Sequence, residues 1–305
     1  MRKFVVRRLV TGIVTVLGVV VIVFFLGRIT GSPAALYLPE NASQERYEQF
    51  NTEYGLDQPL LVQFLRFLGG VVRLDFGDSI WQQRPALEAA LSAMPPTLGL
   101  AAIALALSVI VSVVLGSLAA SRRFKSLDRA ITFGSLTIAS IPDFWFALVC
   151  VLFFAIYLGV LPTSGYDGVD AWILPVATMM LAPVGVMTQV VRGAMIEALS
   201  SGYVQNARAL GFSQRRLVYR HALRNAALPI LSVAGDRAAG MVNGAIIVSA
   251  IFAFPGMGAL VVGAVLNRDF FVLQASVFVV GIAVVLLNVI VDLTYAVADP
   301  RVRLD

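Results

Sequence analysis

The sequence contains one cysteine, one histidine and two lysines among 305 residues, and only 13% of its residues are charged. A single cysteine, Cys150, rules out a disulfide within the chain, and its place in an apolar run is typical of a small buried hydrophobic residue. One histidine and one cysteine cannot provide the ligand cluster that a zinc-type site requires. We therefore expect no metal and no cofactor bound by this chain.

Sequence motifs for ATP hydrolysis and for hydrolase chemistry are also absent. A G-x-x-x-x-G-K-[ST] phosphate-binding loop needs a lysine after its glycines, and neither Lys3 nor Lys125 follows such a pattern. H-E-x-x-H and G-x-S-x-G are absent as well, which removes the usual signatures of a membrane protease or lipase. We expect that the chain is not an enzyme.

The residues that are present are mostly apolar, at 59%, and many lie in runs of about 18 or more, the length that crosses a hydrocarbon core. The net charge of +5 does not indicate nucleic-acid binding, because the basic residues lie between the apolar runs. The sequence predicts an all-α integral membrane protein, with residues 1–305 forming one transmembrane domain in the lipid bilayer. The first run is longer than a signal-peptide core and lacks an A-x-A cleavage site, which favours a retained span.

Six membrane-spanning helices are predicted, near residues 9–29, 96–120, 131–160, 173–191, 229–252 and 272–296. The segments before the first span, between the second and third, and between the fourth and fifth carry most of the arginines and lysines. The first loop, residues 30–95, instead holds four arginines and eight acids. Because basic connections stay in the cytoplasm, both termini are expected there, with loop 30–95 on the outside.

The long cytoplasmic connection, residues 192–228, contains the basic stretch NARALGFSQRRLVYRHALRN (206–225). Small and helix-favouring residues predict a short helix from Gly202 to Leu210, Gly211 breaks it, and Ser213 is the expected N-cap of a second helix. That second helix carries a basic stripe on one side and small apolar residues opposite, namely Arg216, Arg220 and Arg224 against Val218, Ala222 and Ala226. Spacing alone leaves two interpretations open, a lipid-facing helix or one that docks on a cytoplasmic partner.

This connection resembles the EAA coupling loop of ABC importer permeases, in the form found in the dipeptide, oligopeptide and nickel subfamily. The matching residues are Tyr203, Val204, Ala207, Arg208, Ala209, Gly211, Arg220, His221, Ala222, Arg224, Asn225, Ala226 and Pro229. The acid of the EAA triplet is missing, because Gln205 and Asn206 stand at its start. YGLDQPLLVQFLRFLGGVVRLDFGDSI (54–80), SIPDFW (140–145), FPGMG (254–258) and DPRVR (299–303) resemble further subfamily segments, so the likeness extends over nearly the whole chain.

The resemblance implies a type I ABC importer permease fold, with six spans, in the bacterial cell membrane. Partners would be cytoplasmic ABC ATPase subunits, a second homologous permease subunit and an extracytoplasmic solute-binding protein that delivers cargo to loop 30–95. Di- or oligopeptides are the commonest cargo of the subfamily, while nickel chelates, glutathione and some sugars are also carried. The segment that would dock on the ATPase consists of Asn206, Ala207, Arg208, Ala209, Leu210, Gly211, Phe212 and Ser213. His221 would have a structural or docking role rather than a catalytic one.

Charged and polar residues inside the fifth span are candidates for the translocation path. Asp236 and Arg237 lie seven and eight residues beyond Pro229, which is about 10 Å into the span at helical rise. A charge at that depth faces a cavity, another charge or a partner helix, so a substrate path and a pairing with the second permease both remain open. Asn243 and Ser249 are candidates on the same helix. Gly240 and Gly244, one turn apart, predict a close-packing face between helices.

The principal alternative function is a proton- or sodium-coupled secondary transporter. Such proteins depend on intramembrane acids, broken helices and usually inverted repeats. Asp236 is the strongest intramembrane acid in this sequence, and we find no internal repeat. The resemblance of the 206–225 segment to a coupling loop favours the ATP-driven importer.

Overall fold

The computed structural model describes residues 2–29, 33–39 and 41–298, and the DPRVR segment lies outside them. Within this described part the chain is helical and has no β-strand, only one isolated bridge between Asp78 and Pro85. The chain divides into two compact units, one made of residues 97–254 with the described residues from 287 onward, the other of Arg2–Pro96 with Pro255–Leu286. The function of both units as one permease domain stays a prediction.

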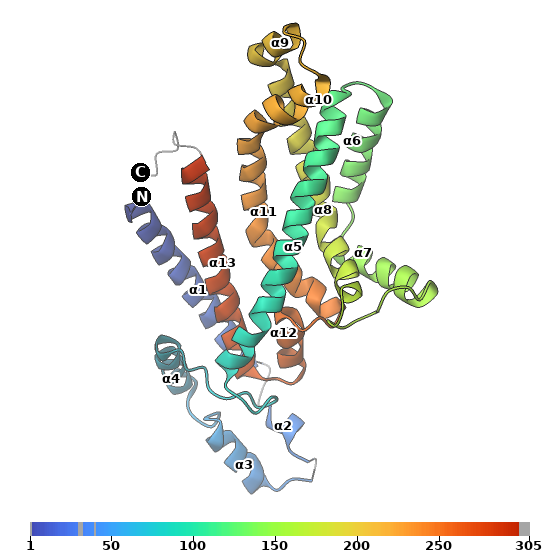
Figure 1. Ribbon diagram of the computed structural model, residues 1–305. Coiled ribbons are helices and arrows are strands. Elements are labelled where there is room, and N and C mark those ends of the chain that lie inside the picture. Colours follow the sequence, from blue (N-terminus) through green and yellow to red (C-terminus); the bar gives the residue numbers. More distant parts are fainter. Residues whose placement is uncertain (1, 30–32, 40, 299–305) are drawn as a thin grey trace. The chain divides into compact units, whose positions relative to one another are not determined.

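Three long helices and a bent pair make up most of the first unit (Figure 1). They are the later part of α5 (Ala86–Ser121), α6 (Ser126–Ala139), α7 (Asp143–Cys150) with the π-helical η1 (Val151–Tyr157), α8 (Asp170–Ser200) and α11 (Leu223–Ile251). α8 is the central helix and packs on α6, α7 and α11. A Cβ at Gly185 of α8 would lie 2.5 Å from the Ser135 carbonyl oxygen of α6. Glycine therefore lets these two backbones approach closely.

The predicted third span, 131–160, is not one straight helix. α6 and the α7–η1 segment meet at a bend of 97°. The break falls at Ile141 and Pro142, because a residue before proline is disfavoured in helical conformation and proline has no amide hydrogen to donate. The prediction of a continuous helix is therefore wrong at this point.

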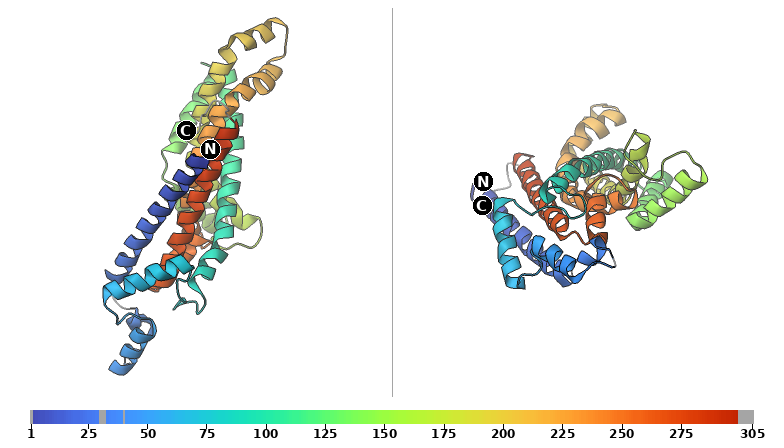
Figure 2. Two further views of the ribbon diagram at one scale, coloured as in Figure 1. Left: turned by 90° about the vertical axis from the view of Figure 1, so that its left-hand side faces the viewer. Right: turned by 90° about the horizontal axis from the view of Figure 1, so that it is seen from below.

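The second unit contains α1 (Arg2–Ile29), α2 (Ala34–Tyr37), α3 (Gln44–Glu53), α4 (Leu60–Arg73), α12 (Met257–Leu266) and the first part of α13 (Phe270–Ala298). Helices α1 and α13 lie side by side, as both views of Figure 2 show, and approach closely at glycines. A Cβ at Gly12 would lie 2.5 Å from Val285 Cγ1, and one at Gly281 would lie 2.9 Å from Val16 Cγ2. At the far end of α1, Phe24 stacks on Phe67 of α4 at 5.1 Å.

In the described part of the chain, four helices are long and apolar enough to cross a membrane, or five if the bent α6–α7 pair counts as one span. These four are Val6–Arg28, Ala86–Ser121, Asp170–Ser200 and Phe270–Thr294. α11 occupies the predicted fifth span but is not among them. The count of six spans and the sides of the termini stay predictions. The second span begins ten residues earlier than predicted, because buried Ala86, Ala89 and Ala93 extend α5 in front of Pro95 and Pro96.

The predicted external loop, residues 30–95, has helical structure of its own and is fixed to the turn before α13. Asp269, fully buried in that turn, accepts hydrogen bonds from the Ser79 hydroxyl (2.6 Å) and the Trp81 backbone N–H (3.0 Å). The Tyr37 hydroxyl donates to the Asn267 carbonyl at 2.8 Å. Burial, and then the charge of Asp269, raise the pKa of Tyr37 to about 12, so its hydroxyl keeps the proton it donates.

Candidate functional site: the coupling hairpin

The predicted coupling loop forms a helical hairpin at one end of the first unit. It consists of α9 (Gly202–Ala209), α10 (Gln214–Arg216) and the π-helical η2 (Leu217–Ala222), which continues into α11. We call residues 201–222 the coupling hairpin; it is drawn at the top of Figure 1. Within the predicted connection, 192–228, α8 runs on to Ser200 and α11 begins at Leu223. The first helix ends at Ala209, within one residue of the prediction.

The coupling hairpin has a small hydrophobic core of its own. Val204, Ala207 and Leu217 are buried together, and Leu199 and Phe212 pack against them. Val204 and Ala207 come from one face of α9, three residues apart, while Leu217 comes from the returning segment. This core holds the two arms of the hairpin against each other, so the tip is a defined structure rather than a loose loop.

An aromatic stack supports the hairpin next to this core. The Arg216 guanidinium lies 4.4 Å from the centroid of the Phe212 ring. On the same ring, His221 stacks with an interplanar angle of 13° and a centroid distance of 5.6 Å. Phe212 and His221 therefore stabilise the hairpin internally, whatever else they contact.

The remaining residues of the predicted docking segment are presented outward. Asn206, Arg208, Ala209, Leu210, Gly211 and Ser213 are exposed, whereas Ala207 is buried and Phe212 half-buried. Leu210 has 77% of its surface exposed at the very tip. We call Ala209, Leu210 and Gly211 the hairpin tip. The Leu210 side chain at the point of this compact hairpin is therefore accessible to a partner.

The backbone at the hairpin tip requires glycine. Gly211 has φ +81°, in the left-handed region that L-residues with a side chain rarely adopt. Beyond it, the N–H of Phe212 donates to the Ala207 carbonyl at 3.3 Å, which closes the end of α9. Ser213 stands at the predicted N-cap position of α10 in extended conformation, but its side chain makes no capping hydrogen bond.

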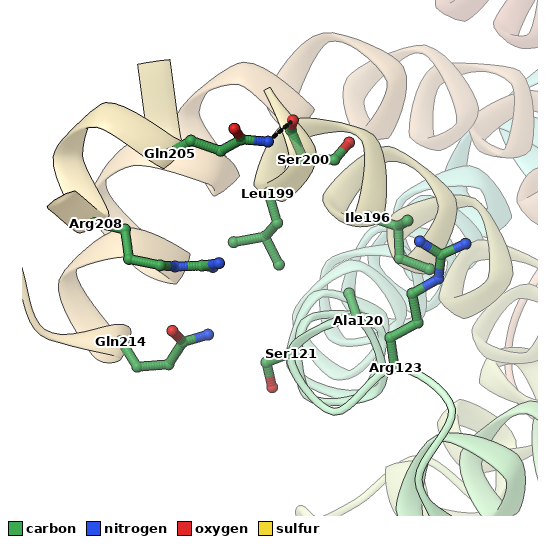
Figure 3. A pocket seen from close by; sticks show the side chains of 9 residues that line it. All are labelled: Ala120, Ser121, Arg123, Ile196, Leu199, Ser200, Gln205, Arg208 and Gln214. Atoms are coloured by element: carbon green, nitrogen blue, oxygen red, sulfur yellow. Dashed lines mark hydrogen bonds between the residues drawn. The ribbon is translucent and has the colours of Figure 1, made fainter. Parts of the chain in front are cut away.

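A polar pocket of about 390 Å³ lies beside the hairpin, between α9, α10 and the ends of α5 and α8 (Figure 3). Arg208 and Gln214 enter it from the hairpin, and Arg123 lines it from the segment after α5. Gln205 donates to the Ser200 carbonyl at 3.0 Å. The pocket is basic and hydrogen-bonding, and suited to an acidic group.

The predicted two-sided character of the returning segment is confirmed. Arg216, Arg220 and Arg224 are exposed. Val218, Ala222 and Ala226 are buried in a cluster with Val191 and Met195 of α8. The η2 segment is wound more widely than an α-helix, a form that often occurs at functional positions.

Sequence reasoning missed an ion pair that braces the base of this region. Asp128 of α6 accepts two hydrogen bonds from the Arg192 guanidinium of α8, at 2.5 and 2.8 Å, and a third from the Phe124 N–H at 2.9 Å. The Asp128 side chain is 4% exposed and that of Arg192 is 23% exposed. The sequence did contain a signal for this ion pair. Asp128 is the one acid in the otherwise basic segment between the predicted second and third spans, and such an acid is well placed to pair with an arginine.

The candidate path residues occupy different sides of α11. Asp236, Gly240 and Asn243 are exposed and follow a spacing of four and three, so they share one face. Arg237 is half-buried, and its Nε has no hydrogen-bond partner among the described residues. Ser249 is fully buried and donates to the Ile246 carbonyl at 3.1 Å. The structure therefore separates Ser249 from the other candidates.

Among the described residues, the predicted glycine packing face makes no close contact with another helix. None of their atoms lies within 4 Å of a Cβ placed on Gly240, and Gly244 would meet only Met179 Cε at 3.9 Å. The prediction of a close contact is wrong for the chain alone, because the helices that pack on α11 approach its other faces.

Two parts of the sequence match the membrane components of one family of transport systems. Residues 112–304 match the binding-protein-dependent transport system inner membrane component, and residues 1–101 match the N-terminal part of such membrane components. The chain belongs to this family. It is a multi-pass permease subunit of a binding-protein-dependent transport system in the bacterial inner membrane.

Similar proteins cover the whole chain. The oligopeptide transport system permease protein AppB of Bacillus subtilis is 33% identical over 99% of this chain and 100% of its own length. The oligopeptide permease OppB of Haemophilus influenzae is 35% identical over 99% of this chain and 100% of its own. The glutathione transport system permease protein GsiC of Salmonella paratyphi A is also 35% identical, over 99% of both chains.

A solved structure shares the fold. The crystal structure of an amino acid ABC transporter with histidines aligns with 70% of this chain and 94% of that chain, with a TM-score of 0.52 and 16% identity. This similarity confirms the ABC transporter permease fold. No comparison favours a proton- or sodium-coupled secondary transporter.

Proposed function

We propose that this chain is one half of the translocation path of an ATP-driven peptide importer, and that its coupling hairpin docks on a separate ATPase subunit. The observation that carries the proposal is the exposed hairpin tip, held by its own core and by the positive φ of Gly211. A rigid hairpin can pass the movement of an ATPase to α8 and α11, into which its arms continue. Hydrolysis on separate subunits agrees with the absence of a phosphate-binding loop in the sequence.

A second permease subunit is proposed as the partner of the exposed face of α11. Asp236 and Asn243 would be costly in contact with lipid, so a polar cavity or another protein chain has to cover them. Gly240, on the same face, allows close approach of another helix. A path between two permeases satisfies both requirements, and Asp236 and Asn243 would line it with Arg237 near its edge.

Peptides are the proposed cargo. Support comes from the relatives, whose names refer to oligopeptides and, in GsiC, to the short peptide glutathione. The proposed solute-binding protein would deliver this cargo at residues 30–95, where acids outnumber arginines.

A mild-detergent pull-down of the full chain from its native membrane, followed by mass spectrometry, tests this assembly. Recovery of an ATPase, a second permease and a solute-binding protein is expected, and the binding protein is then screened against peptides and nickel chelates. If the chain is recovered without partners while a known control complex stays intact, the proposal is wrong. The role of Asp236 in ion coupling would then be tested next.

A further inference from the structure

The second unit contains an apolar cavity with a single arginine in its lining. The cavity has a volume of about 310 Å³ and lies between the end of α1 and the α12–α13 turn. Val23, Leu26, Ala264, Phe270 and Leu273 line its walls, and Arg268 is the one charged residue of its lining. We propose that this cavity binds an acyl chain of an anionic phospholipid, with the phosphate held by Arg268.

The charges around the cavity favour an anion. Arg268 has no ion pair among the described residues, and the neighbouring Asp269 directs its carboxylate away, to Ser79 and the Trp81 N–H. Next to the cavity, the Arg28 guanidinium lies 5.2 Å from the ring centroid of Phe270. Its Nε and Nη1 are buried without a hydrogen-bond partner in the described residues. The two arginines outnumber the one acid beside them, Asp269, so the formal charge next to the cavity is positive.

The surroundings of the cavity fit a lipid rather than a soluble ligand. Leu26, Val265 and Leu266 are exposed apolar side chains around it, as expected for a surface in hydrocarbon. Arg28 ends the apolar span Val6–Arg28, so the arginines stand at the depth where hydrocarbon gives way to headgroups. An apolar pocket beside a basic side chain at that depth matches the two halves of a phospholipid.

Arg268 occupies a position whose backbone favours a different residue. It has φ +49°, in the left-handed region where glycine or asparagine is more easily accommodated. Its N–H donates to the Val265 carbonyl at 3.2 Å and closes the turn after α12. The geometry of the turn therefore does not explain why an arginine side chain stands at this position.

Photo-crosslinking in vesicles tests the site with the full chain and the subunits that accompany it. Phosphatidylglycerol and phosphatidylethanolamine, each with the same diazirine-bearing acyl chain, are compared at equal mole fraction, and labelled peptides are identified by mass spectrometry. We expect phosphatidylglycerol to label residues 23–27 and 264–273 preferentially. Arg268→Gln should weaken that labelling about tenfold, the size expected for a lost charge-assisted hydrogen bond.

Two further variants separate the site from general lipid contact. Arg46→Gln, which removes an exposed arginine of α3 far along the chain from the cavity lining, should leave the labelling unchanged. Val265→Trp should block the cavity and reduce labelling by both lipids. Equal labelling by the two lipids in the wild type, meaning annular lipid only, would overturn the proposal. Unchanged labelling in Arg268→Gln or in Val265→Trp would overturn it too.

Discussion

At the scale of single residues, a substitution of Leu210 tests docking on the ATPase without disturbing the fold. Its side chain is exposed at the hairpin tip and makes no part of the hairpin core, so Leu210→Glu should change stability by less than about 0.5 kcal/mol. If Leu210 fills a pocket of the ATPase, the same substitution should weaken the complex by about 2 kcal/mol, or about 30-fold. Thermal unfolding and co-purification of the ATPase measure the two effects. Full retention of the ATPase would contradict the docking role.

Gly211 gives a second prediction at the same scale, based on backbone conformation. A Cβ at Gly211 would meet no atom of the described residues within 4 Å, so the cost of a side chain there comes from φ +81°. Gly211→Val should cost about 1–3 kcal/mol and abolish uptake with membrane insertion intact. Gly211→Asn should keep much of the uptake, because asparagine tolerates the left-handed region.

Gly202→Ala is the matched control for this series. Gly202 begins α9, has no positive φ and also has open space around a Cβ. Alanine should be accepted there with normal uptake. Equal uptake by the valine, asparagine and wild-type forms at position 211 would show that the tip conformation does not matter for transport.

At the scale of elements, the Asp128–Arg192 ion pair joins α6 to α8 below the coupling hairpin. Asp128→Asn leaves the Arg192 guanidinium without its charge partner and should destabilise the protein by about 2–3 kcal/mol. Because Asp128 is buried, salt should change the effect little. Thermal unfolding at two salt concentrations measures this. Asp167→Asn, at an exposed acid, is the control, and an equal shift in both variants would refute the bracing role.

The external segment provides another prediction between elements. Asp269 holds the Ser79–Trp81 turn through two hydrogen bonds, from the Ser79 hydroxyl and the Trp81 N–H, and accepts a third from the Val272 N–H at the start of α13. Asp269→Ala leaves these donors unsatisfied and should cost about 3 kcal/mol. Protease cleavage near residues 78–85 should then become faster, whereas Asp57→Ala, in the exposed part of the same loop, should not change it. Unchanged cleavage in Asp269→Ala would mean that other contacts hold the turn.

Some elements and buried residues could be predicted from the sequence alone, and others could not. Apolar runs and the Gly211 break are local signals, and they place α9 and the buried face of Val218, Ala222 and Ala226 correctly. Ala207 and Phe212 look like the rest of the docking segment in sequence, and their burial follows from Leu217 returning across α9. The α6–α7 bend had a local signal in Pro142, but its angle depends on how each half packs on α8.

At the scale of the whole molecule, the proposed function requires that the movement of an ATPase reaches the membrane-spanning helices through the coupling hairpin. Both arms of the hairpin continue into helices of the first unit, α8 and α11. α11 also carries the exposed polar face of Asp236 and Asn243. A displacement of the hairpin tip can therefore be transmitted to the candidate path residues through η2 and α11, which are continuous.

Site-specific photo-crosslinking tests docking at the hairpin tip most directly. A photoreactive amino acid is placed at Leu210 and, as a control, at Leu158, an exposed residue after η1, in cells that express the whole assembly. We expect a crosslinked product that contains the ATPase from position 210 and none from position 158. No ATPase product from position 210, in an assembly that still contains the ATPase, would contradict docking at the hairpin tip.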